Sequence, residues 1–153
     1  MTAFGSVDEL LDFAIEKEEE AAQFYTDLAG KMDKPHMKQV FTDFAGEEKK
    51  HKEKVMGIKE GKLLLPVQEK VMDLKIAEYV VDVEASPDMD YQAALIMAMK
   101  KEKASFKLYN DLAAQTDNET VRSTMLIMAQ EEAKHKMRLE IEYDDNYMDE
   151  PRY

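Results

Sequence analysis

The stretch Phe44-Ala45-Gly46-Glu47-Glu48-Lys49-Lys50-His51 is the most informative part of this sequence. Residues three apart share one face of a helix, so Glu48 and His51 point the same way. The same face carries apolar residues at the spacing of a buried helical stripe, namely Met37, Phe41, Phe44, Val55 and Ile58. An acid and a base inside a core stripe require a partner that compensates for their burial.

The motif recurs in the second half as Met128-Ala129-Gln130-Glu131-Glu132-Ala133-Lys134-His135. The two motifs are 84 residues apart (132 − 48 = 84 and 135 − 51 = 84). An upstream apolar stripe in each half carries one carboxylate at the same offset, Glu18 in the first half and Glu102 in the second (102 − 18 = 84). The chain is therefore interpreted as a duplicated helical hairpin, which predicts an all-α fold of four helices.

Two equivalent hairpins would bring these acids and bases to one level of a bundle. Burying several ionised carboxylates costs free energy unless opposite charge compensates them. Two divalent cations would neutralise four glutamates, and each imidazole would add one neutral nitrogen. Carboxylate with imidazole suits iron or manganese, and this ligand set is the known pattern of di-iron carboxylate bundles.

The composition restricts the class of protein. The 153 residues fit one domain, and 5 glycines with 4 prolines are few for a turn-rich β fold. A net charge of −12 argues against a nucleic-acid partner, and 0 cysteines exclude disulfides and thiolate metal sites. No apolar run approaches the ~20 residues of a membrane span, and Met1-Thr2-Ala3-Phe4-Gly5 lacks a signal-peptide pattern. We expect a cytoplasmic protein with no membrane partner.

The pattern predicts helices over 7–31, 35–60, 89–115 and from the turn at Asp117-Asn118 to about 143. Ser6 with Glu9 resembles a capping box for the first helix. The connection over 61–88 has room for a short helix near 67–81, and its length favours a crossover between helices 2 and 3. We expect one domain over residues 1–146 and an acidic C-terminal tail over 147–153.

With these residues on the page, the chain resembles the ferritin-like superfamily, and most closely its rubrerythrin-type di-iron carboxylate proteins. The resemblance covers roughly residues 7 to 143. The residues that carry it are Glu18 with Tyr25, Glu47-Glu48-Lys49-Lys50-His51, Glu102 with Tyr109, and Glu131-Glu132-Ala133-Lys134-His135.

The resemblance implies a ferritin-like four-helix bundle with a long crossover between helices 2 and 3. It also implies two iron ions as cofactor, for which manganese or zinc could substitute. The implied ligands are Glu18, Glu48, His51, Glu102, Glu132 and His135, with Glu48 and Glu132 bridging and no catalytic residue separate from them. Tyr25 and Tyr109 are interpreted either as core packing or as hydroxyl donors to a ligating carboxylate.

Three positions differ from related families. Rubrerythrins proper carry a cysteine-based rubredoxin-like iron site, so this cysteine-free chain would need a separate electron donor. Rubrerythrins typically place an extra Glu one turn after the third-helix ligand, where this chain has Ser105. Bacterioferritins usually place a haem-binding Met where this chain has Lys49, so no haem is expected.

The leading functional hypothesis is a rubrerythrin-like oxidoreductase that reduces hydrogen peroxide or dioxygen. The alternative is a ferroxidase or storage-type iron-handling protein within a larger assembly. A third hypothesis is a bundle that acts through partner contacts with little chemistry of its own. The family resemblance implies a homodimer, and both closure of the hairpins within one chain and exchange between chains remain open.

Overall fold

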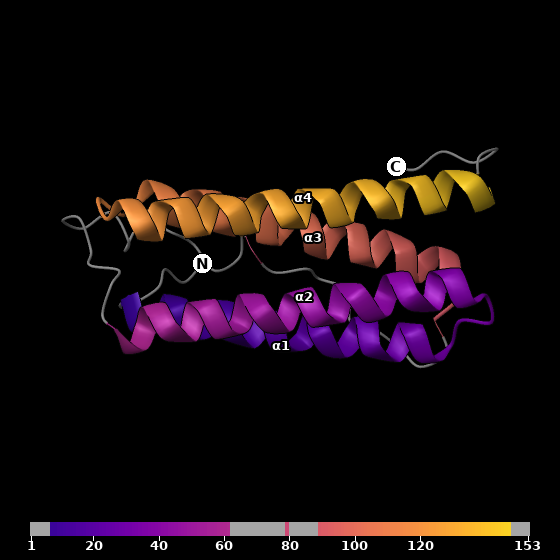
Figure 1. The fold of residues 1–153 in the computed structure, drawn as a ribbon. Helices are drawn as coiled ribbons and strands as arrows, with labels where there is room; N and C mark the ends of the chain where they lie inside the picture. Colours follow the sequence, from indigo (N-terminus) through magenta and orange to yellow (C-terminus); the bar gives the residue numbers. More distant parts are fainter. Residues whose placement is uncertain (1–6, 62–78, 80–88, 148–153) are drawn as a thin grey trace. The chain divides into compact units, whose positions relative to one another are not determined.

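The computed structural model describes residues 7–61, 79 and 89–147 (Figure 1). All regular structure in these ranges is helical: α1 Val7–Gly30, α2 Pro35–Glu60, α3 Tyr91–Ala114 and α4 Glu119–Tyr147. The chain divides into two compact units, residues 3–74 and residues 75–153 with residues 1–2. Each unit holds one helical hairpin, as the duplication in the sequence predicts.

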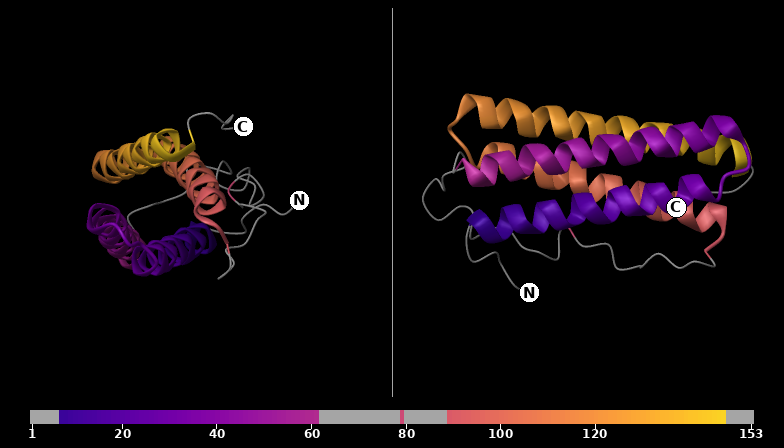
Figure 2. Two further views of the ribbon diagram at one scale, coloured as in Figure 1. Left: turned by 90° about the vertical axis from the view of Figure 1, so that its right-hand side faces the viewer. Right: turned by 60° about the horizontal axis from the view of Figure 1, so that its bottom comes forward.

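The first hairpin pairs α1 with α2 (Figures 1 and 2). Backbone N–H groups of Lys31 and Met32 bond to carbonyls in the last turn of α1, which tightens the chain into a short turn. Pro35 then occupies the first turn of α2, where its missing N–H breaks no helical hydrogen bond. α2 ends at Gly61, whose N–H bonds back to the carbonyls of Gly57 and Lys59.

The second hairpin pairs α3 with α4 in the same manner. α3 begins at Tyr91, two residues later than expected, because the Asp90 carboxylate accepts a 2.8 Å hydrogen bond from the Ala93 N–H and caps the helix. Asn118 performs the same function for α4, accepting a 3.0 Å bond from the Val121 N–H. The predicted turn at Asp117-Asn118 is confirmed.

α4 extends further than the sequence indicated. The prediction ended this helix at about residue 143, whereas α4 continues to Tyr147. The Tyr143 and Tyr147 rings, one turn apart, lie 5.2 Å centre to centre, and the Asn146 side chain donates to the Glu142 carbonyl at 2.8 Å. These contacts within the helix extend it through two aspartates that gave no apolar period.

The predicted apolar stripes are buried in both hairpins. In α2 the five stripe residues named above are at most 8% exposed, and α4 buries Val121, Met125, Met128 and Leu139. The acids and bases of the stripes are buried with them, each at most 3% exposed. The stripe pattern therefore identified the buried face of each hairpin, ionisable residues included.

Some predictions fall outside the described residues: the Ser6 capping box, most of the 61–88 connection with its short helix, and residues 148–153. Tyr79 is the described position within that connection, and it is buried. Its hydroxyl donates to Asp111 at 2.8 Å, and the Lys107 ammonium lies over its ring. Within the described ranges, no helix combines the length and the apolar character needed to cross a membrane.

Candidate metal centre

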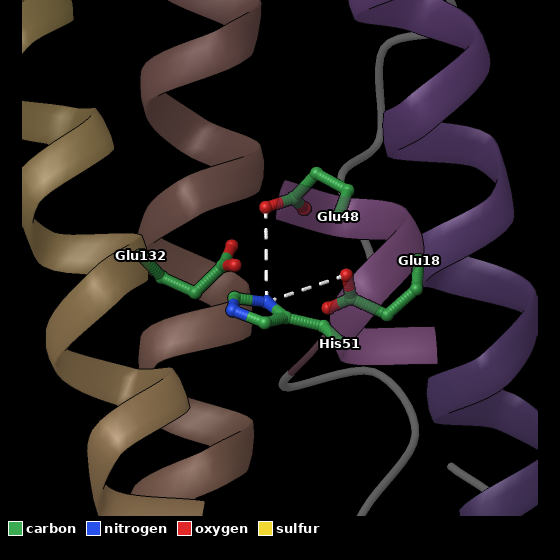
Figure 3. Close-up of side chains that lie close together, drawn as sticks. All are labelled: Glu18, Glu48, His51 and Glu132. Carbon is green, nitrogen blue, oxygen red and sulfur yellow. Dashed lines mark ion pairs between the residues drawn. The ribbon is translucent and has the colours of Figure 1, made fainter. Parts of the chain in front are cut away.

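Glu18, Glu48 and His51 converge inside the first hairpin. Glu18 comes from α1, whereas Glu48 and His51 lie one turn apart on α2. The His51 Nδ1 atom is 3.6 Å from a Glu18 carboxylate oxygen and 3.8 Å from a Glu48 carboxylate oxygen. Figure 3 shows the three side chains directed toward one another, with His51 between the two acids. We refer to Glu18, Glu48 and His51 as the first triad.

Glu102, Glu132 and His135 converge in the same way inside the second hairpin. Glu102 comes from α3, and Glu132 and His135 come from α4. The His135 Nδ1 atom is 3.6 Å from a Glu102 carboxylate oxygen, the separation found for the matched pair in the first hairpin. We refer to these residues as the second triad. The offset of 84 residues therefore applies to geometry as well as to residue type.

Each triad has a donor set that can hold a divalent cation. One ligand atom from each of its three residues lies within 4.8 Å of the other two. Two carboxylates with one imidazole form the mixed oxygen and nitrogen set that suits iron or manganese. A divalent cation would also offset the cost of burying two carboxylates in so small a volume. Among the residues that the structure describes, every candidate metal-binding group is drawn from these six.

Packing around the first triad holds its helices in register. Tyr25 is 1% exposed, and its ring lies 6.1 Å from Phe41 and 5.2 Å from Phe44, centre to centre. On the solvent side, Lys52 pairs with Glu19, and Lys59 pairs with Asp12. The hydrogen bond to Asp12 raises the pKa of Lys59 above its ordinary value. These contacts fix α1 against α2 on both sides of Glu18.

The predicted role of the two tyrosines is confirmed in its packing form for Tyr25, which lies in the aromatic cluster described above. Tyr109 is likewise 1% exposed, one of the largest fully buried side chains in the described residues. Hydrogen bonding from either hydroxyl to a ligating carboxylate stays a prediction. Both residues therefore contribute at least to the cores in which the triads are held.

A second buried polar group, which the sequence reasoning missed, lies in the second hairpin. The Tyr91 hydroxyl donates to Glu142 at 2.6 Å, and the Gln92 amide donates to the Tyr143 hydroxyl at 2.9 Å. Burial, with the hydrogen bond to Glu142, raises the pKa of Tyr91 above its ordinary value of 10.0. We name Tyr91, Gln92, Glu142 and Tyr143 the α3–α4 clasp. Its signal was available, because Glu142 follows Leu139 by three residues on the buried stripe.

Comparisons with known proteins agree with this geometry. The rubrerythrin family model matches residues 9–84 and 93–151, most of the chain. Among solved structures, the fold is similar to that of a Thermotoga maritima protein assigned as a ferritin-like diiron-carboxylate protein. That similarity has a TM-score of 0.76 and 23% sequence identity, and it covers 95% of this chain and 98% of the other.

No curated protein sequence matches the chain significantly. The structural neighbour establishes a ferritin-like four-helix fold. The family model matches both helical hairpins and includes all six triad residues. The chain therefore belongs to the rubrerythrin family.

Proposed function

We propose that this protein is a di-iron oxidoreductase that reduces hydrogen peroxide or dioxygen with electrons from a separate donor. The observation that carries the proposal is the pair of matched, buried Glu, Glu and His triads, one in each hairpin of a rubrerythrin-family chain. A single triad would be compatible with a structural cation. Two triads that match in residue type and in a 3.6 Å contact indicate a site that was duplicated with its chemistry.

In this proposal the six residues of the two triads form one dinuclear centre. Four carboxylates carry four negative charges, which two divalent cations balance. Glu48 and Glu132, the acids of the two Glu-x-x-His motifs, would bridge the two metal positions. The two histidines present the same ring nitrogen, Nδ1, to their carboxylates, so each would contribute one neutral ligand at equivalent places.

The chain's own contribution to the reaction is to hold charge and exclude water. Side chains that are at most 3% exposed cannot exchange freely with solvent, so an oxidant would react in a dry, preorganised site. When bound, two Fe(II) ions would supply the two electrons that, with two protons from solvent, convert hydrogen peroxide to two waters. The electrons must then be replaced from outside, because the chain has 0 cysteines with which to hold a rubredoxin-type iron.

Stopped-flow oxidation of the Fe(II)-loaded protein tests this function. We expect hydrogen peroxide to oxidise the bound iron faster than dioxygen does at equal concentration. Glu48→Ala and Glu132→Ala variants are the controls, and both should lose the protein-dependent rate. Oxidation by peroxide at the same rate in wild type and in both variants would contradict the proposal.

Ferroxidase or storage-type iron handling is the second candidate, and Ser105 is the observation that favours it. Rubrerythrins typically have an extra Glu at that position, and the remaining set of four Glu and two His resembles that of bacterioferritins. The same stopped-flow experiment separates the two candidates, because a ferroxidase would oxidise its iron faster with dioxygen. A particle much larger than a dimer on size-exclusion chromatography would further support the storage reading.

A further inference from the structure

Four large apolar side chains are exposed along α4. Ile127 is 55% exposed, Met137 62%, Ile141 48% and Leu126 42%. Successive helix residues are ~100° apart, so these four fall within about 100° of arc, a single stripe roughly 22 Å long. We name Leu126, Ile127, Met137 and Ile141 the α4 stripe.

The duplication provides an internal reference for this surface. At the matched positions, 84 residues earlier, α2 carries Thr42, Asp43, Glu53 and Gly57, all of them exposed. The two helices agree at the buried positions, including both Glu-x-x-His motifs, and they differ on the exposed face. A polar face in one copy of the hairpin shows that the fold does not require apolar residues here. The α4 stripe therefore needs an explanation outside the core and the triads.

The arrangement of the stripe is symmetric about Lys134. Ile127 and Ile141 lie seven residues, about 10 Å, on either side of it. One edge of the same face carries Glu131 and Arg138, opposite charges centred within one residue of the same point. When two copies of such a helix pack antiparallel about a two-fold axis, each residue meets the one at the mirrored distance. Ile127 would then face the second copy's Ile141, and Glu131 would lie close to the second copy's Arg138.

We propose that the α4 stripe is a self-association surface on which a second copy of this chain packs antiparallel, centred near Lys134. Each contact occurs twice, which is the self-complementarity that a two-fold interface requires. The two Lys134 side chains meet near the axis, where their long stems cover apolar surface while their ammonium groups extend to water. One helical stripe is small for an interface, so we expect a reversible dimer with a dissociation constant on the order of micromolar.

Sedimentation equilibrium between low and high micromolar protein tests the proposal with residues that α2 already uses. Ile127→Asp with Met137→Glu introduces the α2 residues Asp43 and Glu53 at their matched positions. We expect the wild type to shift from monomer to dimer with rising concentration and the double variant to remain monomeric. Met56→Glu is the control, since Met56 is an exposed apolar residue of α2 outside the stripe, and this variant should dimerise like wild type.

Cysteine cross-linking gives a second, independent readout, because the chain has no cysteine of its own. Lys134→Cys places a thiol near the proposed axis, and Lys50→Cys places one at the matched position of α2. A short bis-maleimide should link the first variant into a covalent dimer and leave the second largely monomeric. A wild type that stays monomeric throughout the concentration range would overturn the proposal and assign the stripe to a different partner. Equal cross-linking at both positions would also overturn it.

Discussion

The two hairpins agree at the level of the triads and differ elsewhere. Both place a histidine Nδ1 atom 3.6 Å from the carboxylate of the preceding helix. Further along the helices, the first hairpin has buried Ile58 and an exposed Asp12–Lys59 ion pair, whereas the second has the buried Tyr91–Glu142 hydrogen bond. The duplicated positions therefore stayed alike where a metal can constrain geometry, and they diverged where several kinds of packing serve equally well.

The largest expected effect tests the equivalence of the triads. His51→Ala and His135→Ala each remove one ligand from a matched position, so each should weaken metal binding by more than about 100-fold, beyond the loss from outer-shell changes. Isothermal titration with Co(II) or Mn(II) measures this effect without relying on activity. Circular dichroism of both variants would confirm that the helices remain formed. A large loss in one variant with none in the other would show that the triads are not equivalent.

Core truncations at another matched pair should destabilise both hairpins, though unequally. Phe41 and Met125 occupy equivalent positions (125 − 84 = 41), and both are 0% exposed. Phe41→Ala should cost about 3–5 kcal/mol and Met125→Ala about 2–5 kcal/mol. We expect Phe41 to cost more because its ring contacts Tyr25 and Phe44, 6.1 Å away in each case. Urea unfolding of the metal-free variants measures both costs, and a larger cost for Met125 would refute the ranking.

A double-mutant cycle on the α3–α4 clasp should show coupling that the first hairpin lacks. Tyr91→Phe removes the donor and leaves the buried Glu142 carboxylate short of a hydrogen bond, at a cost of about 1–3 kcal/mol. Adding Glu142→Ile, the residue that Ile58 supplies at the matched position, should restore part of that loss, since both polar groups are then replaced. Costs that simply add would mean that the hydrogen bond contributes little.

The smallest expected effect is a pH dependence confined to the second hairpin. Burial and the bond to Glu142 raise the pKa of Tyr91, so the fold favours the neutral phenol. The resulting stabilisation should be complete below the ordinary value of 10.0 and should be lost progressively as the pH rises above it. Thermal unfolding of wild type and Tyr91→Phe between pH 8 and roughly pH 11 would reveal a steeper decline in wild type. Parallel declines would remove Tyr91 as the cause.

Most of the fold and the triads could be predicted because their signals are local and repeated. Glu48 and His51 are close in sequence, their stripe has helical spacing, and a copy 84 residues later supports the assignment. The clasp could not be predicted in the same way, because Tyr91 and Glu142 are 51 residues apart and neither occupies a repeated motif. The last turn of α4 was missed because a tyrosine pair stabilises it, while its two aspartates resemble a disordered acidic tail.

The most direct test of the central claim is an anaerobic Fe(II) titration of the wild-type protein, monitored by equilibrium dialysis and iron analysis. Two matched triads, each with two carboxylates and one imidazole, predict saturation at two irons per chain. Glu18→Ala and Glu102→Ala, at matched positions, should each lower that number. Saturation at two irons that both variants reduce would support one metal position in each half of a duplicated site. A wild type that binds no iron stoichiometrically would contradict the account.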